Sequence, residues 1–239
     1  MGVGHSASPL HRVVQMDMSG LTTRPLVKAS LSAADSIAEV LGTHVGDGPV
    51  RFHSPSIVAW RRRLTTKYRD QLGEELAWDE GSTFEISEDV AVSADVMFRY
   101  AAAVLDQRGR SELGTLIGRG EPAFQELDEA FDESSRRGFG GKFPHLLLGA
   151  NYWLPYKRQL IIEEPNWDGR LDRYGSVYHL VDEITAVRAA MSEMQPAVAS
   201  VSAQEAPQNV LEAACQASET ISRLAAVAAS KQVPLWTTG

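Results

Sequence analysis

The chain has one cysteine, Cys215, among its 239 residues, and it has no long hydrophobic run. A single cysteine excludes an intramolecular disulfide and fits a reducing compartment. No apolar run approaches the roughly 20 residues that span a bilayer. The first twenty residues contain no uninterrupted apolar core of signal-peptide length. We therefore expect a cytoplasmic protein that is not associated with a membrane.

Basic residues are fewer than acidic ones, with 23 Lys and Arg against 31 Asp and Glu, so the net charge is -8 at pH 7 and the sequence pI is about 5.3. General nucleic-acid binding needs several cations on one face, so this balance disfavours nucleic acid and weakly favours a basic partner. The cations Arg61, Arg62 and Arg63, with Lys67 and Arg69, do not change that view, because three consecutive helical residues point in different directions. A content of 44% hydrophobic residues is enough for a substantial core.

Strong catalytic motifs are absent as well. The chain contains no Gly-x-Ser-x-Gly elbow and no His-Glu-x-x-His pair, and Cys215 has no histidine near it in the sequence. The segment RRGFGGK at 136–142 has glycines and cations that could approach a phosphate. A phosphate loop, however, normally follows a strand and opens a helix, whereas this segment closes a helix. The sequence therefore predicts no cofactor.

Helical periodicity dominates what is present. The pattern predicts a mostly helical α+β protein, with about six helices packed around one antiparallel hairpin or small sheet in residues 143–165. Helices are expected at 26–41, 54–72, about 88–107, 121–137, 177–194 and 208–230, with a further short one at 111–117.

The hairpin is predicted from two apolar runs on either side of Pro155. Residues 146–154 are too few for a typical helix and contain strand-favouring aromatics, and residues 159–162 resume a β-branched run. Proline removes a ladder donor, so the chain is expected to reverse there. Because an isolated hairpin is only marginally stable in water, we expect helices to cover it.

Composition divides the chain into four parts. Residues 1–25 mix Gly, Ser and Pro without a period and are expected to form a disordered arm. Residues 26–195 form the main domain, and the Ala-, Ser- and Pro-rich stretch 196–207 is a linker. Residues 208–239 supply a helix and tail. The alanine-rich seam at 208–230 suits close packing on the main domain or on a second subunit, which would make the protein a homo-oligomer.

Aromatic side chains gather around the expected hairpin, and acidic side chains rim it. The candidate binding residues are Tyr152, Trp153, Tyr156, Trp167, Tyr174, Asp168 and Asp172. Protein interfaces favour Trp and Tyr, although core packing explains part of such a set. The leading hypothesis is therefore a non-enzymatic cytoplasmic protein-binding protein, an adaptor or immunity-like inhibitor of a basic partner.

The alternative hypothesis is a hydrolase-type enzyme. His179 and Glu183 are four residues apart on a predicted helix, so they share one face, opposite the apolar stripe. They could act as acid and base, or hold a divalent metal, if the hairpin exit brings Glu163 or Glu164 alongside. A solvated helix face accounts for the same pattern without a site.

Overall fold

The structure is a computed structural model that describes residues 2–8, 55–76, 78, 84–166, 171–194 and 209–238. Within these ranges the chain forms seven α-helices and a six-stranded mixed sheet, which confirms the predicted combination of helices with β-structure. The helix expected at 26–41, the linker at 196–207, and Trp167 and Asp168 lie outside the described residues. No helix in the described ranges is long and apolar enough to cross a membrane.

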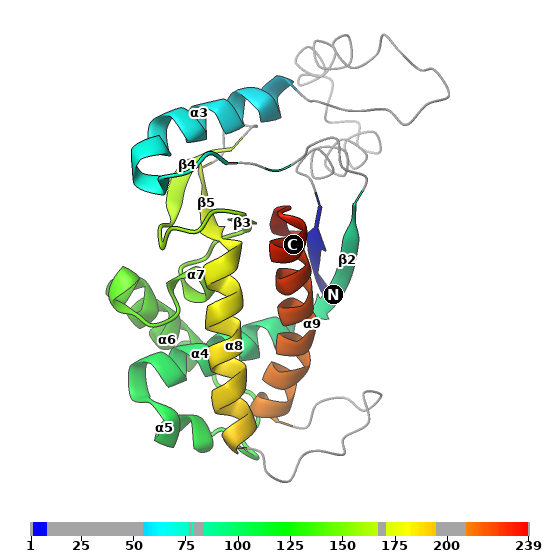
Figure 1. Cartoon of the computed structure of the whole chain (residues 1–239). Coiled ribbons are helices and arrows are strands. Elements are labelled where there is room, and N and C mark those ends of the chain that lie inside the picture. Colours follow the sequence, from blue (N-terminus) through cyan, green and yellow to red (C-terminus); the bar gives the residue numbers. More distant parts are fainter. Residues whose placement is uncertain are drawn as a thin grey trace, which may run out of the picture.

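The strands of the sheet follow the order β2-β1-β6-β3-β5-β4. Among the described strands, β3 and β5 pair in parallel and the other neighbours pair antiparallel. The strand β6, near the C-terminus, lies between the N-terminal strand β1 and β3, so the two ends of the chain meet inside one sheet (Figure 1). The strand bounds are β1 (Gly2–Ala7), β2 (Ile86–Ala91), β3 (Tyr152–Leu154), β4 (Ile162–Pro165), β5 (Leu171–Ser176) and β6 (Leu235–Thr238).

The predicted hairpin is wrong in its pairing. Strands β3 and β4 are not neighbours, because β5 lies between them; the hairpin is formed by β4 and β5, with Ile162 opposite Tyr174. The start of the expected first strand is instead the short helix α7 (Pro144–Leu147), with proline at its beginning. A short apolar run does not distinguish a strand from a buried turn of helix. The prediction of a strand at residues 146 and 147 was therefore wrong.

Two strands, β1 and β2, occur where no local pattern predicts a strand. Gly2–Ala7, assigned to a disordered arm by composition, pairs with β2 on one side and β6 on the other. Strand β2 occupies the stretch taken as the start of a helix, and the Ser6 hydroxyl donates to Ser87 Oγ across the pair at 2.8 Å. Both strands depend on partners about 80 residues or more away, which a local pattern cannot reveal.

Most expected helices are confirmed, with ends shifted by a few residues. They are α3 (Pro55–Leu72), α4 (Val92–Arg108), α5 (Arg110–Gly114), α6 (Phe124–Arg137), α8 (Val177–Met194) and α9 (Val210–Lys231), with a 3-10 turn η2 (Gly138–Gly140) after α6. Helices α4, α8 and α9 cover one face of the sheet, and α3 packs on the other face over β3, β4 and β5 (Figure 1).

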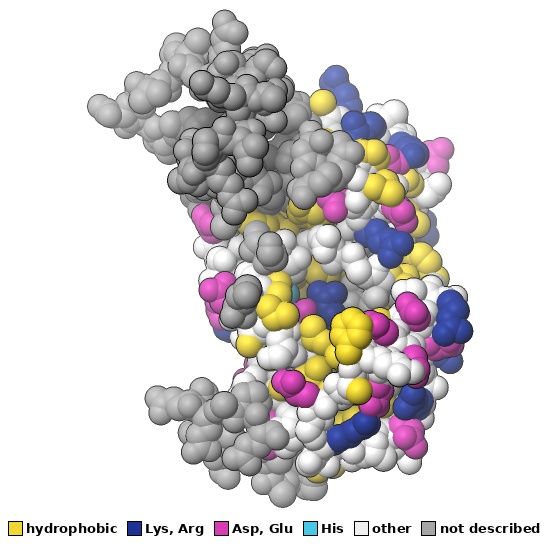
Figure 2. Space-filling model, turned by 180° about the vertical axis from the view of Figure 1, so that it is seen from behind, with side chains coloured by type: hydrophobic (Ala, Val, Ile, Leu, Met, Phe, Trp, Pro, Cys, Tyr) yellow, Lys and Arg dark blue, Asp and Glu magenta, His cyan; other side chains and the backbone are white. Residues whose placement is uncertain are grey.

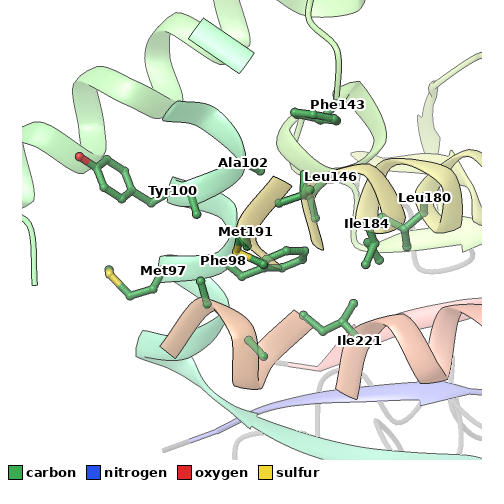
Figure 3. Packing of buried hydrophobic residues seen from close by; sticks show 14 of the residues in the cluster. Met97, Phe98, Tyr100, Ala102, Phe143, Leu146, Leu180, Ile184, Met191 and Ile221 are labelled. Atoms are coloured by element: carbon green, nitrogen blue, oxygen red, sulfur yellow. The ribbon is translucent and has the colours of Figure 1, made fainter. Parts of the chain in front are cut away.

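The larger core lies between the sheet and the bundle of α4, α8 and α9. Phe98 of α4 is fully buried at its centre, with Met191 and Ile184 of α8 and Ile221 of α9 around it (Figure 3). The alanine-rich seam of α9 is buried here, so the C-terminal helix packs on its own chain. Homo-oligomerisation through residues 208–230 stays a prediction.

A second, aromatic core lies on the α3 side of the sheet. Trp60 of α3 packs on Tyr174 of β5 with ring centroids 5.2 Å apart, and Tyr152 and Trp236 complete the contact from β3 and β6. Successive strand residues point to opposite faces, so Leu235 enters the larger core while Trp236 enters this one.

Candidate functional site

The aromatic side chains predicted to bind a partner are mostly inside the molecule. Tyr152, Trp153, Tyr156 and Tyr174 are all buried. The Tyr156 hydroxyl donates to the carbonyl oxygen of Tyr174 at 2.8 Å, and the indole N–H of Trp153 donates to the carbonyl of His145 at 2.8 Å. These rings hold β3, β5 and α7 together and present no surface to a partner.

The acidic residues of the expected rim have partners within the chain. Asp172 accepts from the side-chain amide of Asn166 at 2.7 Å, and a Glu163 carboxylate oxygen lies 3.4 Å from Arg173 Nε. Glu164 is buried, pairs with Lys67 and accepts from the Tyr68 hydroxyl at 2.9 Å. The hydrogen bond from Lys67 lowers the pKa of Glu164.

Glu163 and Glu164 are therefore engaged by cations rather than by His179 or Glu183. In the ranges that the structure describes, no group of three or more His, Cys, Asp or Glu side chains could hold a metal ion. The hairpin glutamates do not complete the acid-base constellation that the spacing of His179 and Glu183 suggested.

Glu183 lies inside the molecule, which corrects its predicted place on the solvated face of α8. Its carboxylate accepts from the backbone N–H groups of His145 at 3.1 Å and Leu146 at 2.8 Å. Burial raises the pKa of Glu183 to about 8, although the two amides act in the opposite direction. The spacing along α8 does not predict this burial, because it depends on α7, which packs against α8 on that side and has no local signal in the sequence.

His145 is the residue that sequence reasoning missed. Its side chain is fully buried, and Nδ1 accepts from the backbone N–H of Ser176 at 3.0 Å. Desolvation lowers the pKa of His145 to about 3, so the ring is neutral and its proton sits on Nε2. No spacing in the sequence signals this histidine, because its contacts come from β5 and α8.

His179 stacks on His145, with ring centroids 5.2 Å apart and an interplanar angle of 14°. Its Nε2 lies 2.8 Å from the carbonyl oxygen of Lys157. A carbonyl can only accept, so Nε2 of His179 is the donor in this contact. The structure thus joins the predicted pair, His179 and Glu183, to an unpredicted histidine.

Gly175 leaves room on β5 for the buried side chain of His145. A β-carbon at this position would lie 2.7 Å from Trp153 Cδ1 and 3.1 Å from His145 Nδ1. Any side chain would push the indole and imidazole rings off β5, so the strand needs glycine here.

The glycine-rich segment at 136–142 does bind an anion, and that anion is the protein's own Asp106. The backbone N–H of Lys142 donates to Asp106 Oδ1 at 2.8 Å, and Arg137 Nη1 lies 3.1 Å from Oδ2. Asp106 is buried beneath the segment. A carboxylate from α4 therefore occupies the place that the pattern suggested for a phosphate.

A second buried polar group links β1 to α4. Asp95 Oδ1 lies 3.7 Å from His5 Nε2, and Asp95 Oδ2 lies 3.0 Å from Arg99 Nε. Burial lowers the pKa of His5. A histidine of the N-terminal strand and a carboxyl group of α4 thus lie side by side in the interior.

Two large apolar side chains are exposed in this part of the chain, Phe124 at the first position of α6 and Ile117 in the turn that follows α5. Phe124 is 78% exposed and Ile117, seven residues earlier, is 51% exposed. Glu121, Asp128 and Asp132 are exposed around or beyond them. Viewed from behind, the molecule shows hydrophobic side chains in the middle of the face among acidic and basic ones (Figure 2).

Comparisons of the chain with protein-family models, with curated proteins and with solved structures found no match.

Proposed function

We propose that this chain is a protein-binding protein, an adaptor or inhibitor, and that the N-terminal half of α6 contacts a basic partner. The observation that carries the proposal is the exposure of Phe124 at the first position of α6, with Ile117 also exposed in the turn after α5. Aromatic side chains that fill a partner's pocket are the usual anchors of an interface. We propose this surface instead of the aromatic residues around β3, because Tyr152, Trp153, Tyr156 and Tyr174 are buried.

Charge supports a basic partner. The exposed carboxylates of Asp128 and Asp132 follow Phe124 at one and two helical turns. The nearby cation Arg119 is bound by Glu126 at 2.6 Å, so it adds little repulsion towards a cationic surface. Complementary charge mainly accelerates association and excludes wrong partners, while the apolar anchors supply affinity.

The hydrolase-type alternative has weaker support. It needs Glu163 or Glu164 beside His179 and Glu183, and both hairpin glutamates are engaged by cations elsewhere.

A photo-crosslinking amino acid at position 124, introduced into the full chain in its native cells, tests the proposal. Leu171 is the matched control, because it is 63% exposed and lies on β5 rather than α6. We expect a crosslink from position 124 to a basic polypeptide, absent from position 171 and lost when Asp128→Lys and Asp132→Lys are added. Equal crosslinking from both positions, or an acidic polypeptide that is indifferent to charge reversal, would overturn the proposal.

A further inference from the structure

Strand β2 is an edge of the sheet, and no strand in the described part of the chain pairs with its outer side (Figure 1). An edge strand with unpaired N–H and C=O groups can accept a further strand. The opposite edge is shielded at its end, because β4 finishes on Pro165, which has no donor, and Arg63 donates to the carbonyl oxygen of that proline at 2.8 Å.

The hydrogen bonds of β1 decide which groups of β2 face outward. The backbone N–H of Ser8 donates to the carbonyl of Pro234 at 3.1 Å, so even-numbered residues of β1 bond towards β6 and odd-numbered ones towards β2. Ser87 and Asp89 lie opposite even-numbered residues of β1. Their N–H and C=O groups therefore point away from the sheet.

The side chains of Ser87 and Asp89 are exposed as well, on the face of β2 away from the buried Val90. Glu88, between them, is half-buried and paired with Arg223 of α9. Among the described residues no cation pairs with Asp89. A carboxylate thus lies beside the outward backbone groups.

A second copy of the chain fits this edge poorly. Antiparallel pairing of two copies through their outward groups brings acidic side chains directly opposite one another: Glu88 on Glu88, Asp89 on Asp89, or Glu85 on Asp89, depending on the register. Like charges at directly opposite positions destabilise a sheet.

We propose that β2 binds an extended segment of a basic protein, which adds a strand to this edge of the sheet. Backbone groups of the segment bond to the N–H and C=O groups of Ser87 and Asp89, and a lysine or arginine of the segment lies opposite Asp89 on the exposed face. The net charge of -8 favours the approach of such a segment. No residue of α6 takes part, so the inference is independent of the proposed function.

The test is amide hydrogen exchange of the full chain, followed residue by residue by nuclear magnetic resonance, with a synthetic peptide as the probe. The peptide alternates Lys and Val over about six residues, the usual length of a strand. We expect it to slow exchange at Ser87 and Asp89 in a saturable way and to leave Glu88 and Val90, which already bond to β1, unchanged. A peptide that alternates Glu and Val should have no effect.

The Asp89→Lys variant should bind the Lys-Val peptide about fivefold more weakly, because an attractive cross-strand pair becomes a repulsive one. Glu219→Lys is the matched control, since this exposed carboxylate lies on α9.

The proposal is overturned if the Lys-Val peptide leaves exchange at Ser87 and Asp89 unchanged, if the Glu-Val peptide slows it equally, or if both variants weaken binding alike. Exchange at these two residues that slows as the protein concentration rises, without peptide, would overturn it in favour of a second copy.

Discussion

At the scale of single residues, Gly175 lets β5 pass close beneath two aromatic rings, those of Trp153 and His145. We predict that Gly175→Ala lowers the free energy of unfolding by about 1 to 3 kcal/mol, because its β-carbon would overlap Trp153. Urea unfolding of the purified variant measures this. Gly120→Ala is the matched control, since a β-carbon there meets nothing within 4 Å. Equal stability of the two variants would contradict the account of β5.

Phe124 and Phe98 should differ in their contribution to stability, because the Phe124 ring is mostly exposed and the Phe98 ring is fully buried. Phe98→Ala should cost about 3 to 5 kcal/mol of unfolding free energy, because it leaves a cavity between α4, α8 and α9. Phe124→Ser should change stability by less than about 0.5 kcal/mol. Thermal unfolding compares them, and a large loss with Phe124→Ser would mean that this ring serves the fold rather than a partner.

At the scale of elements, the contact between α7 and α8 should make stability depend on pH in two opposite ways. The pKa of His145 falls from 6.5 to about 3 on folding, so the unfolded chain takes up a proton between these values. Stability from this group is therefore lost as the pH falls through that window. The pKa of Glu183 rises from 4.5 to about 8, so its stability is present at low pH and lost as the pH rises through its window.

Each group contributes a slope of at most about 1.4 kcal/mol per pH unit, and the two slopes cancel where the windows overlap, near about pH 5.5. We predict that His145→Gln removes the loss on the acid side and that Glu183→Gln removes the loss on the alkaline side. Urea unfolding of both variants from pH 4 to about 8 checks this, by the difference from the wild type at each pH. A difference that stays constant with pH would refute the pKa assignments.

At the scale of the whole molecule, the two ends of the chain depend on each other. Strand β6 bonds to β1 on one side and to β3 on the other, and it places Leu235 in one core and Trp236 in the other. Deleting residues 235–239 should abolish cooperative unfolding, because loss of a fully buried tryptophan alone costs about 3 to 5 kcal/mol.

Circular dichroism during thermal unfolding measures this effect, with deletion of Gly239 alone as the control. A sharp transition in the longer deletion would show that β1, β2 and the helical bundle fold without the central strand.

How much of this architecture follows from the sequence depends on the range of the interactions involved. Helices α3, α6, α8 and α9 were predictable, because three-and-four spacing and capping are local properties. Strand β1 was not, because its six residues, glycine and serine among them, acquire a structure only when β2 and β6 flank them. The clustering of aromatic residues around β3 was visible in the sequence, but their packing in the core depends on α3, which lies over them.

The sequence by itself determined the helical majority, the acidic balance and the absence of strong catalytic motifs, since composition and periodicity fix these properties. Only the tertiary structure decided that β5 separates β3 from β4, that Glu183 is buried, and that His145 meets His179. The physical reason is that the pairing of β3 with β5 and the contacts of α7 with α8 join segments about 20 or more residues apart. Their free energy depends on burial and pairing that exist only after the layers have packed.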